Sequence, residues 1–292
     1  MPDVAFVTYR DHPQLTPDDH PLLTELERLG WGARAHCWDD PEVDWTRFAA
    51  VVLRSCWDYH LRPVEFHAWL ASLDAQQVRL WNPTSVVRWN MDKHYLRELA
   101  ARGVAIPETA WFEARQVPDL QRLLEERGWA DVVIKPSVSA AGHETWRSDI
   151  GRLRADQVRL AHQAATSGVL VQEFIPEVVT QGELSLVYLA GDYSHAVRKR
   201  PAAGDFRVQE RFGGTTAPDQ AGAGARAAAT RAVAAIPGEW LYARVDGVER
   251  NGTFLVMELE VIEPSLFFAA APLAPKLLAE AIVERYMGQV AG

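Results

Sequence analysis

The sequence has little of what a secreted or membrane protein needs. It contains two cysteines among 292 residues, Cys37 and Cys56, so a framework of disulfide bonds is excluded. No apolar run approaches the ~18 residues that a membrane-spanning helix requires. The first residues, MPDVAFVTYRDHPQ, lack the basic start and the apolar stretch of a signal peptide. These absences predict a cytoplasmic protein with no membrane partner.

A concentrated basic region is absent as well. The formal net charge is −9, and the lysines and arginines are scattered along the chain. A protein that tracks nucleic-acid phosphates needs such a region, so nucleic acid is not expected as a partner. An acidic chain that binds a smaller polyanion must gather its few cations in one place and recruit a divalent cation.

The first 83 residues alternate strand and helix patterns. Short apolar runs predict strands at 4–9, 33–38, 50–55 and 78–83, with helices at 21–30 and 63–73. This alternation predicts an N-terminal doubly wound domain, in which helices cover a parallel sheet. No G-x-G-x-x-G follows the first strand, so a dinucleotide fingerprint is absent.

The rest of the chain mixes helices, strands and hairpins. The patterns predict a helix over 90–103 with Asn90 as its cap, strands over 108–114, 131–137 and 168–175, helices over 118–128 and 274–288, and hairpins over 183–200 and 240–261. Asn251-Gly252 is a strong two-residue turn signal for the second hairpin. Residues 200–232 are rich in Gly, Pro and Ala and begin without periodicity, which favours a lid or binding loop.

Two segments carry features of a nucleotide site. Lys135 ends the strand VVI and precedes the small-residue loop 136–143, where backbone N–H groups can fold over a phosphate. This is no Walker A loop, and a Lys-Pro after a strand is more often structural. The segment 169–177 can offer backbone groups to an adenine edge, and Glu183 can hold ribose hydroxyls. An ordinary inter-domain hinge explains this second segment equally well.

Three carboxylates are expected to meet on one face of the second hairpin. Glu258 and Glu260 point the same way because side chains alternate along a strand, and the turn folds the strand of Asp246 back beside them. Three such anions need metal ions or cations to offset their repulsion, and hard oxygen ligands suit Mg²⁺. A strand with its polar face in solvent has the same pattern.

The order of these pieces resembles the ATP-grasp superfamily, in the branch of D-alanine–D-alanine ligase and glutathione synthetase. MDK, VIKPS, QEFIPE, a following Glu, Lys-Arg, R-x-D and E-x-E succeed one another over roughly residues 80–270. The fold class that this implies is α/β, with an N-terminal doubly wound domain followed by two α+β ATP-grasp subdomains. The expected bounds are 1–88 for the substrate-side domain, 89–175 for the central subdomain and 176–292 for the C-terminal subdomain.

The resemblance implies that ATP binds along the middle of the chain. Lys93 and Lys135 would touch its phosphates, and the loop from Ser137 through Ser139 to Gly142 would fold over them.

The same resemblance implies which residues contact the adenine, the ribose and the γ-phosphate. Glu173, Phe174 and Ile175 would flank the adenine, and Glu183 would bind the ribose. Lys199 would approach the γ-phosphate.

For the chemistry, the resemblance implies an arginine and a metal site. Arg244 would stabilise the developing oxyanion, and Asp246, Glu258 and Glu260 would hold two Mg²⁺ ions, with Mn²⁺ as a substitute. Glu260 departs from the family pattern, which usually has Asn there. Glu263 is expected to lie behind these ligands.

The N-terminal strings narrow the resemblance to the group that includes the O-ureido-serine cyclo-ligase of cycloserine biosynthesis. VTY, WDDPEVDW, RSCWDYH and the stretch 82–104 carry it. Arg54, Trp57, Asp58 and Tyr59 follow a strand end, where open α/β sheets bind ligands, so they are expected to contact the substrate. Arg54 could clamp a carboxylate and Asp58 an ammonium, unless the two merely tie loops together.

The implied activity is ATP-dependent ligation. A carboxylate of a small amino-acid derivative becomes an acyl phosphate and then forms a C–N bond, within the same molecule or with a second substrate, as in glutathione or dipeptide synthesis. Arg207 would contact phosphate or substrate from a lid at 200–225. A non-catalytic ATP-binding protein and a phosphotransferase are the other readings. The resemblance is compatible with a homodimer or tetramer.

Overall fold

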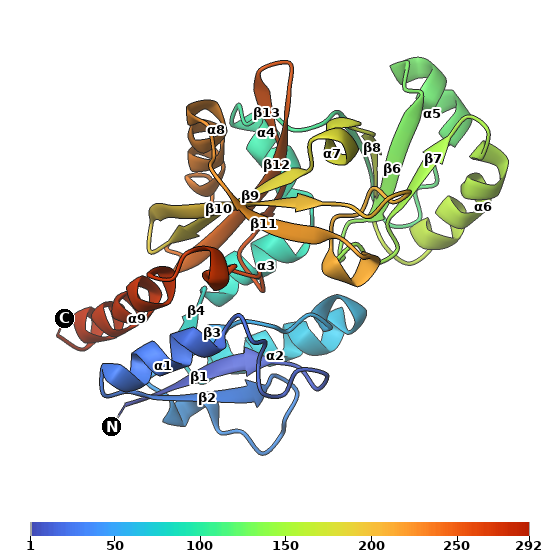
Figure 1. Cartoon of the computed structure of the whole chain (residues 1–292). Helices are drawn as coiled ribbons and strands as arrows, with labels where there is room; N and C mark the ends of the chain where they lie inside the picture. The colour runs from blue at the N-terminus through green and yellow to red at the C-terminus, as the bar shows by residue number, and fades with distance from the viewer. Residues whose placement is uncertain (1, 292) are drawn as a thin grey trace.

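The computed structural model describes residues 2–291 and contains three sheets, arranged as Figure 1 shows. Short elements join them: the 3-10 helices η1 (Trp45–Arg47), η2 (Tyr59–Leu61), η3 (Glu210–Phe212) and η4 (Phe268–Ala270), and the α-helix α7 (Glu177–Thr180). Among the described residues no helix is long and apolar enough to cross a membrane.

The N-terminal sheet is parallel, as predicted, with the order β2-β1-β3-β4. Its strands are β1 (Asp3–Thr8), β2 (Gly32–Cys37), β3 (Ala50–Leu53) and β4 (Leu80–Trp81). Helix α1 (His20–Arg28) and the C-terminal helix α9 (Ala274–Ala291) share a core with Val4 and Phe6 on one face. Helix α2 (Pro63–Ala75) packs over Ala5 and Val7 on the other, so both faces are buried.

The second sheet has the order β5-β8-β6-β7 and lies beside helices α5 (Leu120–Arg127) and α6 (Leu153–Ala164) (Figure 1). Its strands are β5 (Thr109–Phe112), β6 (Asp131–Pro136), β7 (Trp146–Asp149) and β8 (Val169–Glu173), and they pair antiparallel. Val132 and Ile134 pack under the helices. Because side chains alternate, Val133 and Lys135 face the opposite way, toward a cleft.

The third sheet is antiparallel, with the order β11-β10-β9-β12-β13. Its strands are β9 (Glu183–Leu189), β10 (Asp192–Arg200), β11 (Thr215–Asp219), β12 (Tyr242–Arg250) and β13 (Thr253–Glu260). Helices α8 (Ala223–Val233) and α4 (Tyr95–Ala101) pack on one of its faces. The predicted turn joins β12 to β13, with Asn251 and Gly252 both at positive φ, as a type I′ turn requires.

The helix predicted over 90–103 is wrong as a single element. The chain forms α3 (Thr84–Met91) and α4, with a break that places Lys93 between them. Asn90 does not cap a helix; its amide donates to the carbonyl of Leu259 (2.8 Å) and accepts from the N–H of Val261 (3.0 Å). These bonds pin α3 to β13.

The lid predicted over 200–225 is too long. Strand β11 pairs with β10, and α8 begins at Ala223, so only the stretch between β10 and β11 lacks a long element. We call residues 201–214 the lid segment. The proposed bounds at 88 and 175 remain a prediction. Helices α4 and α9 each pack on a sheet outside their predicted unit.

Candidate active site

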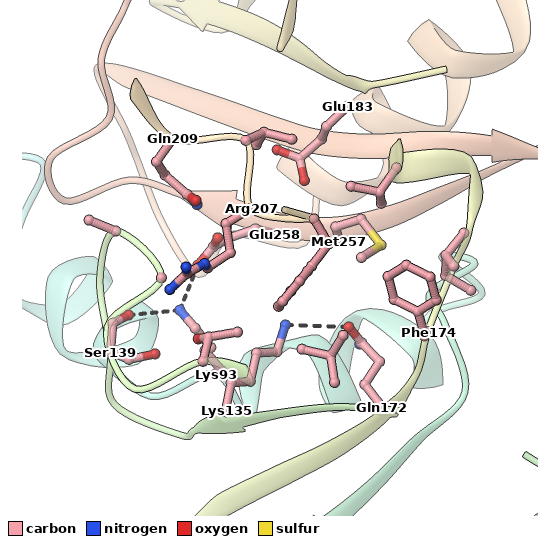
Figure 2. Close-up of a pocket in the computed structure, with 18 of the residues that line it drawn as sticks. Lys93, Lys135, Ser139, Gln172, Phe174, Glu183, Arg207, Gln209, Met257 and Glu258 are labelled. Carbon is pink, nitrogen blue, oxygen red and sulfur yellow. Dashed lines mark hydrogen bonds and ion pairs between the residues drawn. The ribbon is translucent and has the colours of Figure 1, made fainter. Parts of the chain in front are cut away.

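A cleft lies between the second and third sheets. The open space between its walls, counted together with the solvent at its mouth, is about 740 Å³. Figure 2 shows two lysines pointing from one wall toward carboxylates on the other. The lining comprises Lys93, Val133, Lys135, Ser139, Ala141, Gly142, Thr145, Gln172, Glu173, Phe174, Ile175, Val178, Glu183, Phe206, Arg207, Val208, Gln209, Met257 and Glu258.

The two lysines differ in their partners. The ammonium of Lys93 donates to the Ser139 carbonyl (2.8 Å) and pairs with Oε1 of Glu258 (2.5 Å). Lys135 reaches only Oε1 of Gln172, at 3.4 Å, among the described residues. Burial lowers the pKa of Lys135 to about 8, although Glu258 opposes the shift. Lys135 is therefore a desolvated cation without an anion, ready for an anionic ligand.

The small-residue loop after β6 closes against the lid segment. Gly142 has φ +70°, and a Cβ at that position would lie 3.3 Å from both Oε1 of Gln209 and Cε2 of Phe212. Arg207 lies over the Phe212 ring and is held by Asp205 through Nη2 (2.8 Å). The close approach explains why glycine occupies this position.

One end of the cleft is apolar and flat. Phe174 and Phe206 meet edge to face with ring centroids 6.1 Å apart. The carboxylate of Glu173 is turned to Arg250 (2.8 Å). Within residues 2–291 the N–H of Ile175 donates to no other group, so it is available to a ligand edge. This combination suits a planar heterocycle.

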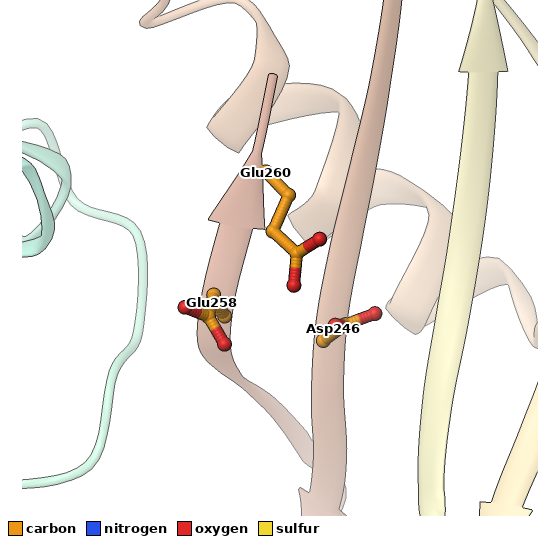
Figure 3. Close-up of side chains that lie close together, drawn as sticks. All are labelled: Asp246, Glu258 and Glu260. Carbon is orange, nitrogen blue, oxygen red and sulfur yellow. The ribbon is translucent and has the colours of Figure 1, made fainter. Parts of the chain in front are cut away.

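The predicted acidic cluster forms beside this cleft, and Figure 3 shows its three side chains close together on neighbouring strands. Oxygens of Asp246, Glu258 and Glu260 lie within 4.8 Å of one another. In the register of the hairpin, Asp246 faces Glu258 and Arg244 faces Glu260. The cross-strand pairing thus places the carboxylates and one arginine on a single face.

A β-bulge shapes this wall. Asp246 pairs with Glu258 while the next residue, Gly247, pairs with Val256, so Met257 is the extra residue. Met257 and Glu258, although adjacent in sequence, consequently both line the cleft. Simple alternation gives no sign of this.

Cations hold the cluster but do not neutralise it fully. Nη2 of Arg244 donates to Asp246 (2.8 Å) and Glu260 (2.6 Å), and Lys199 bridges Asp246 (3.0 Å) and Glu183 (2.6 Å). Burial opposes ionisation of Asp246, but Arg244 and Lys199 outweigh it and hold its pKa well below the usual range. Burial, aided by the other two carboxylates and opposed by Arg244, raises the pKa of Glu260 to about 7. The surplus negative charge suits a divalent cation.

Comparisons with known proteins agree with this geometry. The N-terminal domain model of the D-cycloserine synthetase DcsG matches residues 4–82, and the ATP-grasp domain model of prokaryotic glutathione synthetase matches residues 104–235. The cycloserine biosynthesis protein DcsG of Streptomyces lavendulae is 32% identical over 283 residues, which are 92% of this chain and 93% of that protein. The chain belongs to the ATP-grasp family.

Solved structures of the ATP-grasp family have the same fold. The crystal structure of D-cycloserine synthetase DcsG has a TM-score of 0.88 at 30% identity, covering 97% of this chain and 99% of that chain. A D-alanine–D-alanine ligase from Bacillus anthracis gives 0.70 at 14% identity and covers 100% of both chains, a likeness of fold alone.

As an ATP-grasp ligase, the chain forms C–N bonds and uses ATP, a carboxylate substrate and a divalent metal. The residues present fit a metal: three carboxylates offer hard oxygen atoms on one sheet face, and two of them, Glu258 and Glu260, are only partly buried, with side chains 29% and 24% exposed.

The structure brings most of the predicted ATP and metal residues together. Ten of them line the cleft: Lys93, Lys135, Ser139, Gly142, Glu173, Phe174, Ile175, Glu183, Arg207 and Glu258. Asp246 and Glu260 lie beside it, bound to Lys199 and Arg244. Ser137 lies outside, and its hydroxyl donates to Oδ2 of Asp92 (3.0 Å). The individual roles of these residues in the ATP-grasp reaction remain predictions.

Arg54, predicted to clamp a substrate carboxylate, is already bound within the protein. It is 2% exposed, its Nε donates to Asp19 (2.7 Å) and its Nη2 to the carbonyl of Pro264 (2.9 Å). The structure gives the clamp no support, because the side chain is buried and its Nε and Nη2 are engaged; Nη1 is buried and has no partner within residues 2–291. Arg54 does join two loops through an ion pair, but the carboxylate in that pair belongs to Asp19 and not to Asp58.

The other three residues predicted to bind substrate differ in their surroundings. Tyr59 is 4% exposed and packs against Phe66, so it is a core residue and the structure does not support its prediction either. Asp58 accepts from Nε1 of Trp38 (2.8 Å). Trp57 is half-buried and donates its Nε1 to the carbonyl of Glu263 (3.0 Å), which places it near the acidic cluster.

Several residues that line the cleft were not predicted from the sequence. Gln172 shares a sheet face with Lys135, and alternation along β8 could have identified it. Phe206 and Gln209 come from the lid segment, which has no periodicity to place them. Met257 depends on the bulge.

Proposed function

We propose that this chain is a cyclo-ligase, which activates the carboxylate of an O-ureido-serine-like amino acid and closes a ring through a nitrogen of the same molecule. The observation that carries the proposal is the extent of the similarity to DcsG. It includes residues 4–82, the parallel sheet whose carboxyl edge is where open α/β folds bind ligands.

ATP would lie in the cleft with its adenine between Phe174 and Met257. The N–H of Ile175 is free to meet the heterocycle, and Lys93, Lys135 and the loop at Gly142 would surround the phosphates. Glu183 would hold the ribose.

Asp246, Glu258 and Glu260 would hold two Mg²⁺ ions, which neutralise phosphate charge when bound. The cations of the chain then act by position. Arg244, fixed by Asp246 and Glu260, would face the oxygen on which charge develops, and Lys199 would approach the γ-phosphate.

The chemistry has two steps. A carboxylate oxygen bonds to the γ-phosphorus while the bond to ADP breaks. The ring nitrogen then bonds to the acyl carbon, the bond from that carbon to the phosphate oxygen breaks, phosphate leaves and the nitrogen loses a proton. The lid segment, with Arg207 and Phe212, would exclude water from the acyl phosphate.

The test is turnover of both enantiomers of O-ureido-serine with Mg-ATP, with products identified by mass spectrometry. ADP together with a ring-closed product supports the proposal. An adduct formed only when a second amine is added would refute cyclisation and leave a two-substrate ligase.

A further inference from the structure

Glu263 is a buried carboxylate that the reaction above does not use. Its exposed fraction is 7%. Within residues 2–291 its carboxylate has no hydrogen-bond or ion-pair partner, yet its oxygens are not sealed from solvent. A desolvated, unpaired carboxylate is costly, and such groups are normally paired with a cation.

The backbone around Glu263 is fixed from several sides. Nε1 of Trp57 donates to the carbonyl of Glu263 (3.0 Å), and Nη2 of Arg54 donates to that of Pro264 (2.9 Å). Nη1 of Arg244 donates to the carbonyl of Ser265 (3.2 Å). The donors come from the carboxyl edge of the parallel sheet and from β12, so Glu263 lies where substrate side and metal side meet.

The nearby cations are already engaged. Lys93 is paired with Glu258 (2.5 Å), and Arg244 with Asp246 (2.8 Å) and Glu260. Burial and the neighbouring charge of Glu260 raise the pKa of Glu263 well above its ordinary range. Among the described residues no cation forms an ion pair with Glu263, and both Lys93 and Arg244 are held by other carboxylates.

Glu263 is close enough to the acidic cluster to be affected by its charge but is not a member of it. The carboxylates whose oxygens gather within 4.8 Å are Asp246, Glu258 and Glu260, without Glu263. A single carboxylate outside that set suits an ammonium group better than a divalent ion, which needs several oxygens gathered together.

We propose that Glu263 binds the ammonium group of the substrate, and that the substrate is therefore a small amino acid with a free amino group. The inference rests on the proposed function, which places the activation of the substrate carboxylate beside Arg244 and the acidic cluster. In an α-amino acid the ammonium lies one carbon from the carboxyl carbon. The charges of Arg244 and Glu260 both act on Glu263, so an ammonium bound to Glu263 would leave the substrate carboxylate close to Arg244.

The experiment compares paired substrates, each as the free amino acid and as its N-acetyl derivative: O-ureido-serine, serine and alanine. ADP release is measured for the wild type, Glu263→Gln and the surface control Glu249→Gln. The wild type and the control should consume only free amino acids. Glu263→Gln should raise KM for the amino acid by about 30-fold or more, as expected when one partner of a desolvated ion pair is removed. Its KM for ATP and its Mg²⁺ dependence should not change.

Three results would overturn the inference. The first two are N-acetyl derivatives consumed as fast as their free partners and an unchanged amino-acid KM in a folded Glu263→Gln variant. A changed Mg²⁺ dependence would make Glu263 a metal ligand instead and overturns it too. Glu263→Asp, which keeps the charge, should recover part of the affinity, whereas a purely structural role would not follow charge. Ring closure is measured separately from the product. An open-chain amide formed from a free amino acid would refute cyclisation but would leave the role of Glu263 in binding the ammonium group intact.

Discussion

The ion pair between Arg54 and Asp19 should stabilise the protein rather than bind substrate. Its side chains are 1% and 2% exposed, and Nε of Arg54 lies 2.7 Å from Oδ1 of Asp19. The same guanidinium holds the carbonyl of Pro264 at 2.9 Å, on the segment that follows β13. The pair therefore links the start of α1 and the end of β3 to the segment that follows the β12–β13 hairpin.

Asp19→Asn removes the charge and keeps the shape. Leaving a buried charge without its partner costs about 3–5 kcal/mol, and we expect about 3 kcal/mol, because the Asn oxygen can still accept one hydrogen bond. Urea unfolding followed by tryptophan fluorescence measures the loss, since Trp31, Trp38 and Trp45 lie in the N-terminal cores. The double variant Asp19→Asn with Arg54→Met should regain most of the stability, because no charge is then left buried.

The matched control is Glu126→Gln, which breaks an exposed pair with Arg122 whose side chains are 58% and 76% exposed. Exposed pairs contribute about 0–1 kcal/mol, so this variant should unfold near the wild-type urea concentration. Unchanged stability of Asp19→Asn together with a raised substrate KM would refute the reasoning and restore Arg54 as a substrate clamp.

Three further predictions concern the cleft. Glu258→Gln should stay folded yet lose about 10²–10³-fold in kcat, which is the usual effect of removing one group that stabilises developing charge. Steady-state ADP release measures the loss, with Glu249→Gln as the control. Near-normal turnover would refute the assignment of Glu258 as a metal ligand. Burial lowers the pKa of Lys135 to about 8, so this lysine becomes neutral in the free protein above that pH. Calorimetry at higher pH should therefore show the affinity for ATP falling by up to about tenfold per pH unit. Lys135→Arg should abolish this dependence because guanidinium stays charged, and a persistent slope would assign it to another group. Gly142→Ala should lower the free energy of unfolding by about 1–2 kcal/mol because residue 142 has a positive φ. It should also weaken ATP binding, because the new methyl group would lie 3.3 Å from Gln209. An unchanged ATP affinity in thermal-shift titrations would mean that ATP binding does not need the contact between the loop and the lid segment.

Local patterns predicted the parts of the fold that local physics determines. The parallel sheet followed from apolar runs alternating with helical stripes, and both faces are buried as such runs require. The second hairpin followed from Asn251-Gly252. The pairing of Asp246 with Glu258 did not follow from that turn, because the register of the turn alone opposes Asp246 to Met257 and the β-bulge shifts it to Glu258.

The rest depends on contacts distant in sequence. The partner of Arg54 is 35 residues away and has no local signal. Helix α3 stops where Asn90 bonds to β13, a contact of 169 residues' separation that overrides the capping pattern. Helix α9 docks on α1 at the opposite end of the chain.

The most direct test of the acyl-phosphate reaction is the fate of the carboxylate oxygens. O-ureido-serine labelled with ¹⁸O in both carboxylate oxygens is turned over with Mg-ATP, and the inorganic phosphate is analysed by mass spectrometry. Activation through an acyl phosphate predicts one ¹⁸O atom in each phosphate released, with ADP as the nucleotide product. Unlabelled phosphate, or label found in AMP, would contradict the account.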